Sequence, residues 1–141
     1  MTQNQPAAYG PDELFDNLIA GQWVPSEDRS RNINPSDTSD VLGQFARADA
    51  ATVERAIAAA RESAETWAHS PIQQRFDILD TTGTLIKERA DQLGELLARE
   101  EGKQLKEATA EVLRASQLFK FFAGETLRNT GEVVDLSLIH I

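Results

Sequence analysis

The chain has 141 residues, no cysteine, and 14 Lys and Arg against 23 Asp and Glu, which gives a net charge of -9. This length suggests a single domain. The acidic balance, without a basic patch, excludes nucleic acids and anionic membranes as partners. The lack of cysteine excludes disulfides, thiolate metal sites and a cysteine nucleophile within these residues.

The first residues of the chain show no targeting pattern. Residues 1–13 are polar, contain Pro6, Gly10 and Pro11, and lack the basic and apolar regions of a signal peptide. No apolar run approaches the roughly 20 residues that a membrane-spanning helix requires. We therefore expect a mobile leader over 1–13 and a cytoplasmic location.

Two β-hairpins are expected next. Residues 18–24 place apolar side chains around Ala20-Gly21. Because alanine avoids positive φ, we expect a bulged turn in which Gly21 alone has a positive φ. Residues 31–35, a strand that ends in a turn, and the strand 41–46 after the polar residues 36–40 predict a second hairpin. Trp23 would anchor the first hairpin, or its ring would line a site.

Helical periodicity follows the hairpins. Asp49 can cap a helix over 50–68, whose apolar residues recur at helical spacing: Val53, Ile57, Ala60, Ala64 and Trp67. Ser70, Pro71 and Gln73 have the order of a capping box with proline at the first helical position, which predicts a helix over 71–89. The apolar row of that helix includes Gly83, and a glycine in such a row indicates close approach by a neighbouring backbone.

Two further helices complete the pattern. Asp91 can cap a helix over 92–101, and Gly102 can end it with a positive φ. A long helix then begins at Leu105 and is expected to end at Gly131. Its apolar residues recur at helical spacing and should face one side: Leu105, Ala108, Val112, Ala115, Phe119 and Phe122, widened by Leu118 and Phe121.

The order of elements predicts an α+β arrangement, two hairpins followed by four helices. Strands and helices do not alternate, so a parallel nucleotide-binding sheet is not encoded here. The sequence lacks G-x-G-x-x-G, and the stretch from Gly94 to Lys103 lacks the spacing and the hydroxyl residue of a phosphate-binding loop.

Candidate acid-base and metal-binding pairs have ordinary structural explanations. Glu100 and Glu101 are helix neighbours pointing about 100° apart, which favours a solvated helix end over a catalytic pair. Glu107 and Glu111 share one helix face, where a charged surface is commoner than a metal site.

The two histidines give no catalytic pair either. His69 lies beside Ser70, which is needed as a helix cap, and His140 has no evident partner. We therefore assign no catalytic, cofactor-binding or metal-binding residue to this chain.

An ordered set of short motifs nevertheless resembles the amino-terminal part of the aldehyde dehydrogenase superfamily, NAD(P)-dependent oxidoreductases of aldehydes. The resemblance runs from about Leu18 to Val134 and includes Ala-Gly-x-Trp and an Asn-Pro turn. The motifs that carry it in the second half are Glu101-Gly102-Lys103, Glu107-Ala108, Glu111-Val112 and Phe121-Phe122-Ala123-Gly124-Glu125.

The resemblance implies that residues 14–134 are part of the N-terminal, cofactor-binding-domain region of an α/β aldehyde dehydrogenase fold. In that family a cysteine thiolate attacks the aldehyde, hydride passes to NAD or NADP, and a glutamate activates water. The resemblance places these groups after Val134. This fragment would therefore bind no cofactor and be inactive, with a structural role, and its partners would be the rest of the polypeptide, a small-molecule aldehyde and other copies in a homo-oligomer.

Two finer points come from the same resemblance. Relatives can hold a monovalent cation near Asn32-Ile33 and a carboxylate at the Glu100 position, where aspartate is common; with glutamate here we assign no site. The sequences of residues 34–40 and 99–103 resemble those of semialdehyde dehydrogenases of sugar-acid breakdown.

An alternative is a free-standing helical interaction module that binds a partner through the Leu105 to Phe122 row. An enzyme fragment would instead leave the Phe119 and Phe122 row uncovered, and the isolated chain would be loose or would associate. Residues 135–141 depart from the family pattern, and four of the seven are Leu or Ile with no partner strand in the sequence, so we expect a foreign tail joined near Val134. The alternative is a native edge strand.

Overall fold

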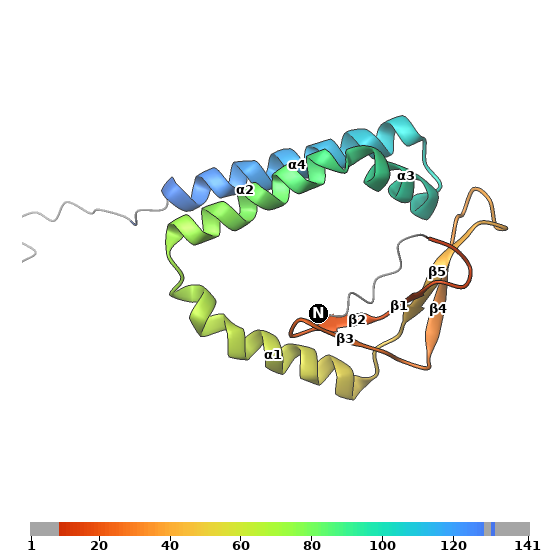
Figure 1. Cartoon of the computed structure of the whole chain (residues 1–141), viewed down its shortest axis with the longest axis horizontal. Coiled ribbons are helices and arrows are strands. Elements are labelled where there is room, and N and C mark those ends of the chain that lie inside the picture. The colour runs from red at the N-terminus through yellow and green to blue at the C-terminus, as the bar shows by residue number, and fades with distance from the viewer. Residues whose placement is uncertain (1–8, 129–130, 132–141) are drawn as a thin grey trace, which may run out of the picture.

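The computed structural model describes residues 9–128 and residue 131 (Figure 1). Most of the expected leader 1–13, the whole of the expected tail 135–141 and His140 lie outside the described residues. The described elements are five strands followed by four helices, which confirms the α+β order of the sequence prediction.

The strands form two small sheets. Both predicted hairpins are present: β2 pairs antiparallel with β3, and β4 pairs antiparallel with β5. A strand that the sequence pattern did not predict, β1, adds to β5 in parallel and gives the order β1-β5-β4. Its two residues are too few to show an alternating pattern. The strands are β1 (Leu14–Phe15), β2 (Asn17–Ile19), β3 (Gln22–Val24), β4 (Arg29–Ile33) and β5 (Val41–Ala46).

The turn of the first hairpin differs from the prediction. Ile19 pairs with Gln22, so the loop has only Ala20 and Gly21, and both have positive φ, 50° and 74°. The prediction that Gly21 alone would have a positive φ is wrong. A two-residue loop matches the twist of the paired strands only with both central residues left-handed. Pairing of the strands therefore imposes this conformation on Ala20, at a cost of about 1–2 kcal/mol.

The four helices begin and end close to the predicted positions. The first matches the prediction at both ends, and the Asp49 side chain accepts a hydrogen bond from the Thr52 backbone N–H at 2.8 Å, as a helix cap should. Gly131, outside the last helix, has a φ of 83°. The helices are α1 (Ala50–Ala68), α2 (Ile72–Glu88), α3 (Ala90–Glu101) and α4 (Leu105–Arg128).

Two predicted helix caps are wrong. Ser70 does not cap α2, because its hydroxyl donates to the Trp67 carbonyl at the end of α1, and Pro71 takes the N-cap position. Gln73 donates to Asp77 and so closes no capping box. Asp91 lies inside the first turn of α3, which starts directly at the end of α2 and leaves no room for a separate cap.

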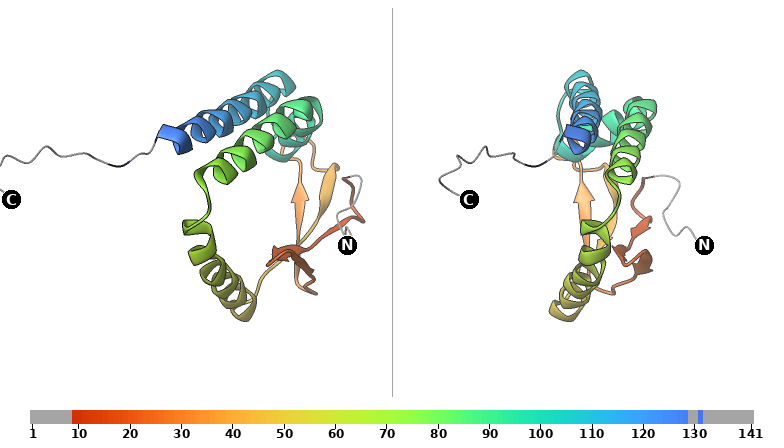
Figure 2. Two further views of the ribbon diagram at one scale, coloured as in Figure 1. Left: turned by 60° about the vertical axis from the view of Figure 1, so that its left-hand side comes forward. Right: turned by 90° about the vertical axis from the view of Figure 1, so that its left-hand side faces the viewer.

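Helices α2, α3 and α4 pack together (Figure 2). The predicted close approach at Gly83 is confirmed: a Cβ there would lie 3.0 Å from the Ser116 carbonyl oxygen, and the buried Ser116 hydroxyl donates to the Gly83 carbonyl at 2.7 Å. Gly94 has the same role between α3 and α4, where a Cβ would lie 2.9 Å from the Cα of Thr109. The small residues let the helix backbones come close.

The apolar row of α4 divides into two parts. Ala108 and Val112 are buried, whereas Leu105, Phe119 and Phe122 are exposed, and the uncovered Phe119 and Phe122 row agrees with the expectation for an enzyme fragment. Where α2 and α3 cover α4, the buried row is set by close backbone contact and favours small residues. Its members are Ala108, Val112, Ser116 and Ala123.

Helix α1 diverges from α2 and α4 and lies chiefly against β2 (Figure 1). It has no buried residue, and its predicted apolar row, including Val53 and Trp67, is largely exposed. Of the helices within residues 9–128, none has both the length and the apolar character needed to cross a membrane.

Candidate functional site

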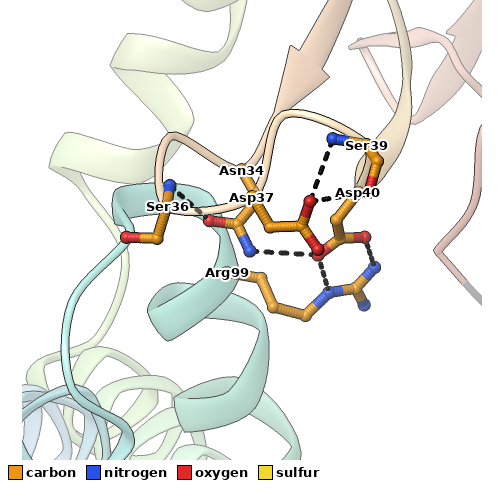
Figure 3. Close-up of polar contacts among 6 residues, drawn as sticks. All are labelled: Asn34, Ser36, Asp37, Ser39, Asp40 and Arg99. Carbon is orange, nitrogen blue, oxygen red and sulfur yellow. Dashed lines mark hydrogen bonds and ion pairs between the residues drawn. The ribbon is translucent and has the colours of Figure 1, made fainter.

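The most developed polar cluster joins the turn between β4 and β5 to the end of α3 (Figure 3). Arg99 donates to both carboxylate oxygens of Asp40, from Nε at 2.9 Å and from Nη2 at 2.7 Å. The side chain of Asn34 donates to the same carboxylate at 3.1 Å. The planar guanidinium matches the carboxylate in two parallel hydrogen bonds, the strongest ion-pair geometry available to proteins.

The turn is held in shape by its own side chains. The Asn34 side-chain oxygen accepts from the Ser36 N–H at 2.9 Å, and Asp37 accepts from the N–H and hydroxyl of Ser39 at 3.1 and 2.6 Å (Figure 3). These are Asx-type turns, which a short polar side chain makes with the backbone two residues on. The turn therefore presents Asp40 to Arg99 in one fixed direction.

A second contact from the turn reaches the residue that ends α3. Gly102 has a φ of 67°, which confirms the predicted glycine at this helix end, and its carbonyl accepts from the Ser36 hydroxyl at 2.8 Å. A Cβ on Gly102 would lie 2.7 Å from Pro35 Cγ. Glycine is thus required here both by the backbone conformation and by the neighbouring turn.

The electrostatics of this cluster favour a structural role. Hydrogen bonds from Arg99 and then Asn34 lower the pKa of Asp40 to about 2, and the hydrogen bond to Asp40 raises the pKa of Arg99. Both groups stay charged around neutral pH and are already paired with each other. A general acid or base needs a pKa near the working pH, so this pair suits docking and not proton transfer.

The candidate carboxylates at the end of α3 point to different partners. Glu100 accepts from the side-chain amide of Asn32 at 2.9 Å, at the position where relatives are expected to hold a cation. Glu101 instead pairs with Lys103, whose Nζ also lies 2.7 Å from Glu111. The carboxylates of Glu101 and Glu111 both raise the pKa of Lys103. Glu100 and Glu101 thus lie at a charged, exposed helix end, as interpreted from the sequence.

The other candidates remain apart in the structure. His69 Nδ1 donates to the Glu65 carbonyl at 2.9 Å, and the Ser70 hydroxyl donates to Trp67, so the two side chains form no nucleophile and base pair. Glu107 is exposed, and Trp23 is half-buried in the first hairpin opposite Leu18. Within the described part of the chain, no three His, Cys, Asp or Glu side chains come together as a metal site would require.

The strand-to-helix joint among the described residues lacks the features of a dinucleotide site. The strand-to-helix joint from β5 to α1 is Arg47-Ala48-Asp49, which has no glycine to bring the backbone near a pyrophosphate. The Asp49 carboxylate occupies the helix N-terminus, and the hydrogen bond that it accepts from Thr52 lowers its pKa. A negative charge therefore stands where a phosphate would have to bind.

The sequence did not reveal the Arg99 and Asp40 pair. These residues lie 59 positions apart, and an arginine in the last turn of a helix ordinarily needs no partner beyond the helix end. Only the docking of the turn on α3 brings them together. The docked turn thus ties the strands to the layer of helices.

Comparison with known proteins identifies the fold. Residues 23–139 match the model of the aldehyde dehydrogenase family, and the chain belongs to this family. The family oxidises aldehydes, and its members use NAD or NADP.

Several relatives act on semialdehydes, as their names state. The chain is 34% identical over 120 residues to alpha-ketoglutaric semialdehyde dehydrogenase of Bacillus subtilis, covering 84% of this chain and 25% of the relative. It is 34% identical over 111 residues to alpha-ketoglutarate semialdehyde dehydrogenase of Haloferax volcanii, covering 77% and 23%.

Solved structures share the fold. A variant of 1-pyrroline-5-carboxylate dehydrogenase from Thermus thermophilus superposes with a TM-score of 0.83 at 32% identity, covering 91% of this chain and 25% of that one. The chain thus spans about a quarter of the length of the relatives that it matches.

Proposed function

We propose that this chain is the N-terminal structural layer of an NAD(P)-dependent aldehyde dehydrogenase that oxidises an aldehyde to a carboxylic acid. Residues 14–134 would belong to the cofactor-binding domain and would bind neither cofactor nor substrate by themselves. The cofactor would accept hydride in the remainder of the polypeptide, where the family's cysteine and glutamate would also lie. The residues of this chain would position that remainder.

The observation that carries the proposal is the uncovered apolar surface on two helices that are otherwise well formed. On α4, Phe121 and Phe122 are 57% and 56% exposed, although the same helix is buried at Ala108 and Ala123. On α1, Ile57 is 56% exposed. Large apolar surfaces of this kind mark contacts with something else. The family membership supports the rest of the same polypeptide as that partner.

The lack of cysteine supports an inactive chain. The family reaction needs a thiolate nucleophile, and this sequence has none. The Asp49 carboxylate at the only described joint between a strand and a helix also argues against a cofactor site among these residues. The working protein would be a cytoplasmic homo-oligomer of the complete polypeptide.

The substrate class that the relatives support is a semialdehyde, an aldehyde that also carries a carboxylate. Relatives named for alpha-ketoglutarate, malonate and succinate semialdehydes match this chain at 29–34% identity. The matched residues form a layer of the fold and not a substrate pocket, so the proposed substrate class depends on relatedness alone.

Two measurements test the proposal. First, the purified chain is mixed with NAD or NADP and a semialdehyde, and formation of the reduced cofactor is followed. We expect no rate above that of a boiled control. Turnover by the chain alone would contradict the structural role.

Second, residues 23–134 replace the matching segment of the Bacillus subtilis relative. We expect the chimera to oxidise alpha-ketoglutaric semialdehyde, because the replaced layer supplies packing only. A chimera that is folded and binds NADP or NAD but does not turn over would contradict the proposal, since residues of the layer would then matter for chemistry.

The exposed phenyl rings of Phe121 and Phe122 also favour a second candidate, the free-standing interaction module. A module should unfold sharply as a monomer at every concentration. The enzyme layer should instead associate as concentration rises, because its uncovered apolar rows would meet between copies. Thermal unfolding at several concentrations, with analytical ultracentrifugation, separates the two.

A further inference from the structure

The direction of α1 is not set by packing along its length. None of its residues is buried, and its contacts with other elements lie chiefly against β2. Figure 1 and Figure 2 show α1 diverging from the packed α2, α3 and α4 and leading back toward the strands. The corner between α1 and α2 is therefore a further place where its angle can be fixed.

The end that meets α2 is a short corner, residues 69–71. Several hydrogen bonds in this corner close α1 on itself: the backbone N–H groups of His69 and Ser70 donate to Glu65 and Trp67, and the Ser70 hydroxyl donates to Trp67. Pro71 begins α2 without any side-chain cap. These bonds terminate α1 but do not connect it to α2.

Arg75, on the first turn of α2, makes the connection. Its Nη2 donates to the Ala68 carbonyl at 2.6 Å and to the Ser70 carbonyl at 3.0 Å, and its Nε donates to the Ser70 hydroxyl oxygen at 3.0 Å. The side chain is partly buried. A rigid guanidinium that binds the last carbonyl of α1 and two oxygens of Ser70 in the corner restricts both the bend and the twist of the corner.

The other end of α1 follows β5, whose hairpin with β4 is joined to α3 by the ion pair between Asp40 and Arg99. The β4–β5 hairpin docks on α3 through that ion pair and through Ser36 on Gly102, and α1 runs from β5 back to α2. Residues 9–128 therefore make a ring, and among the helices described there α1 alone has no buried residue. Charged hydrogen bonds contribute at both places where the ring closes.

We propose that Arg75 is a positioning residue that fixes the angle between α1 and α2, so that the uncovered apolar row of α1 is held in one direction before its partner binds. This device is independent of the substrate and of the enzyme activity proposed above. Its loss should free α1 while α2, α3 and α4 remain packed.

Distances between spin labels can test this in the full chain, which has no native cysteine to interfere. One label pair, Ala58→Cys with Glu107→Cys, reports the position of α1 relative to α4. The second pair, Thr81→Cys with Glu107→Cys, reports the packing of α2 on α4. All three sites are exposed.

We expect a single narrow distance for both pairs in the parent chain. Arg75→Ala should remove the narrow distance of the α1 pair only, because the three oxygens lose their common donor. Arg75→Lys, which cannot supply the planar fork, should broaden it partly. Arg61→Ala, on the exposed face of α1, is the matched control and should leave both distances narrow.

Three results would overturn the proposal. The α1 distance could keep its width in Arg75→Ala, or it could be equally broad in the parent chain. In either case Arg75 would not set the angle. If both pairs broadened together in Arg75→Ala, the residue would support the whole fold and would not act specifically at the corner.

Discussion

Helices α1 and α4 have the same kind of amphipathic pattern but different surroundings. Val112 on α4 is 8% exposed, whereas Val53 on α1 is 45% exposed. The difference lies in the partners, because α4 meets glycine notches at Gly83 on α2 and Gly94 on α3. An apolar row predicts a helix with a face to cover, and the neighbouring element decides whether that face is covered.

The comparison continues within α4 itself. Ser116 contacts Gly83 on α2 and is buried, as is Ala123, whereas Phe121 and Phe122 are more than half exposed. The buried row contains small residues because the helix backbones approach closely there. The exposed row contains large ones, which suit a partner that lies outside the described residues.

The largest effect is expected from filling the notch at Gly94. Gly94→Val would place its Cβ 2.9 Å from the Cα of Thr109, so α3 and α4 must separate, and we expect a loss of about 3 kcal/mol of unfolding free energy. Urea unfolding at low protein concentration, followed by far-ultraviolet circular dichroism, measures this. Ala64→Val on exposed α1 is the control and should change stability by less than about 0.5 kcal/mol. Equal effects would remove the distinction between the two helices.

The next effect compares the same substitution in both helices. Val112→Ala should destabilise by about 2 kcal/mol, because it leaves a cavity in the packed part of α4. Val53→Ala should change the unfolding free energy by less than about 0.5 kcal/mol, since that side chain is largely exposed. A larger loss for Val53→Ala would show that α1 is covered in solution.

A smaller effect is expected from two serines that both donate to helix carbonyls. Ser116→Ala removes a buried bond to Gly83 and should cost about 1 kcal/mol. Ser63→Ala removes an exposed bond to Ala59 on α1 and should cost nothing measurable, because water replaces it. The same urea titration reports both, and a cost for Ser63→Ala would contradict the assignment of α1 as a solvated helix.

The smallest effect concerns the polar contact that closes the ring. The pKa of Asp40 falls from 3.8 to about 2 on folding, so its contribution is fully present above pH 3.8 and is lost as pH falls toward about 2. Asp40→Asn should flatten this part of the stability profile. Asp37→Asn, in the same turn but bonded only to Ser39, should keep it. An unchanged profile in Asp40→Asn would show that the ion pair with Arg99 does not form in solution.

Much of the secondary structure follows from local chemistry. Asp49 at the start of α1 and Gly102 at the end of α3 act as predicted, since a cap and a left-handed residue depend only on neighbouring backbone. The order of hairpins and helices, and the close approach at Gly83, also follow from the sequence. The lack of cysteine limited the chemistry of the chain before any fold was known.

The tertiary structure decided what depends on distant partners. Strand pairing imposed a positive φ on Ala20. The hydroxyl of Ser70 donates to the Trp67 carbonyl at the end of α1 and so does not cap α2. Arg99 and Asp40 show no mutual signal along the chain. Burial of α4 and exposure of α1 likewise differ although the patterns are alike, because burial is a property of two surfaces and a sequence pattern describes only one of them.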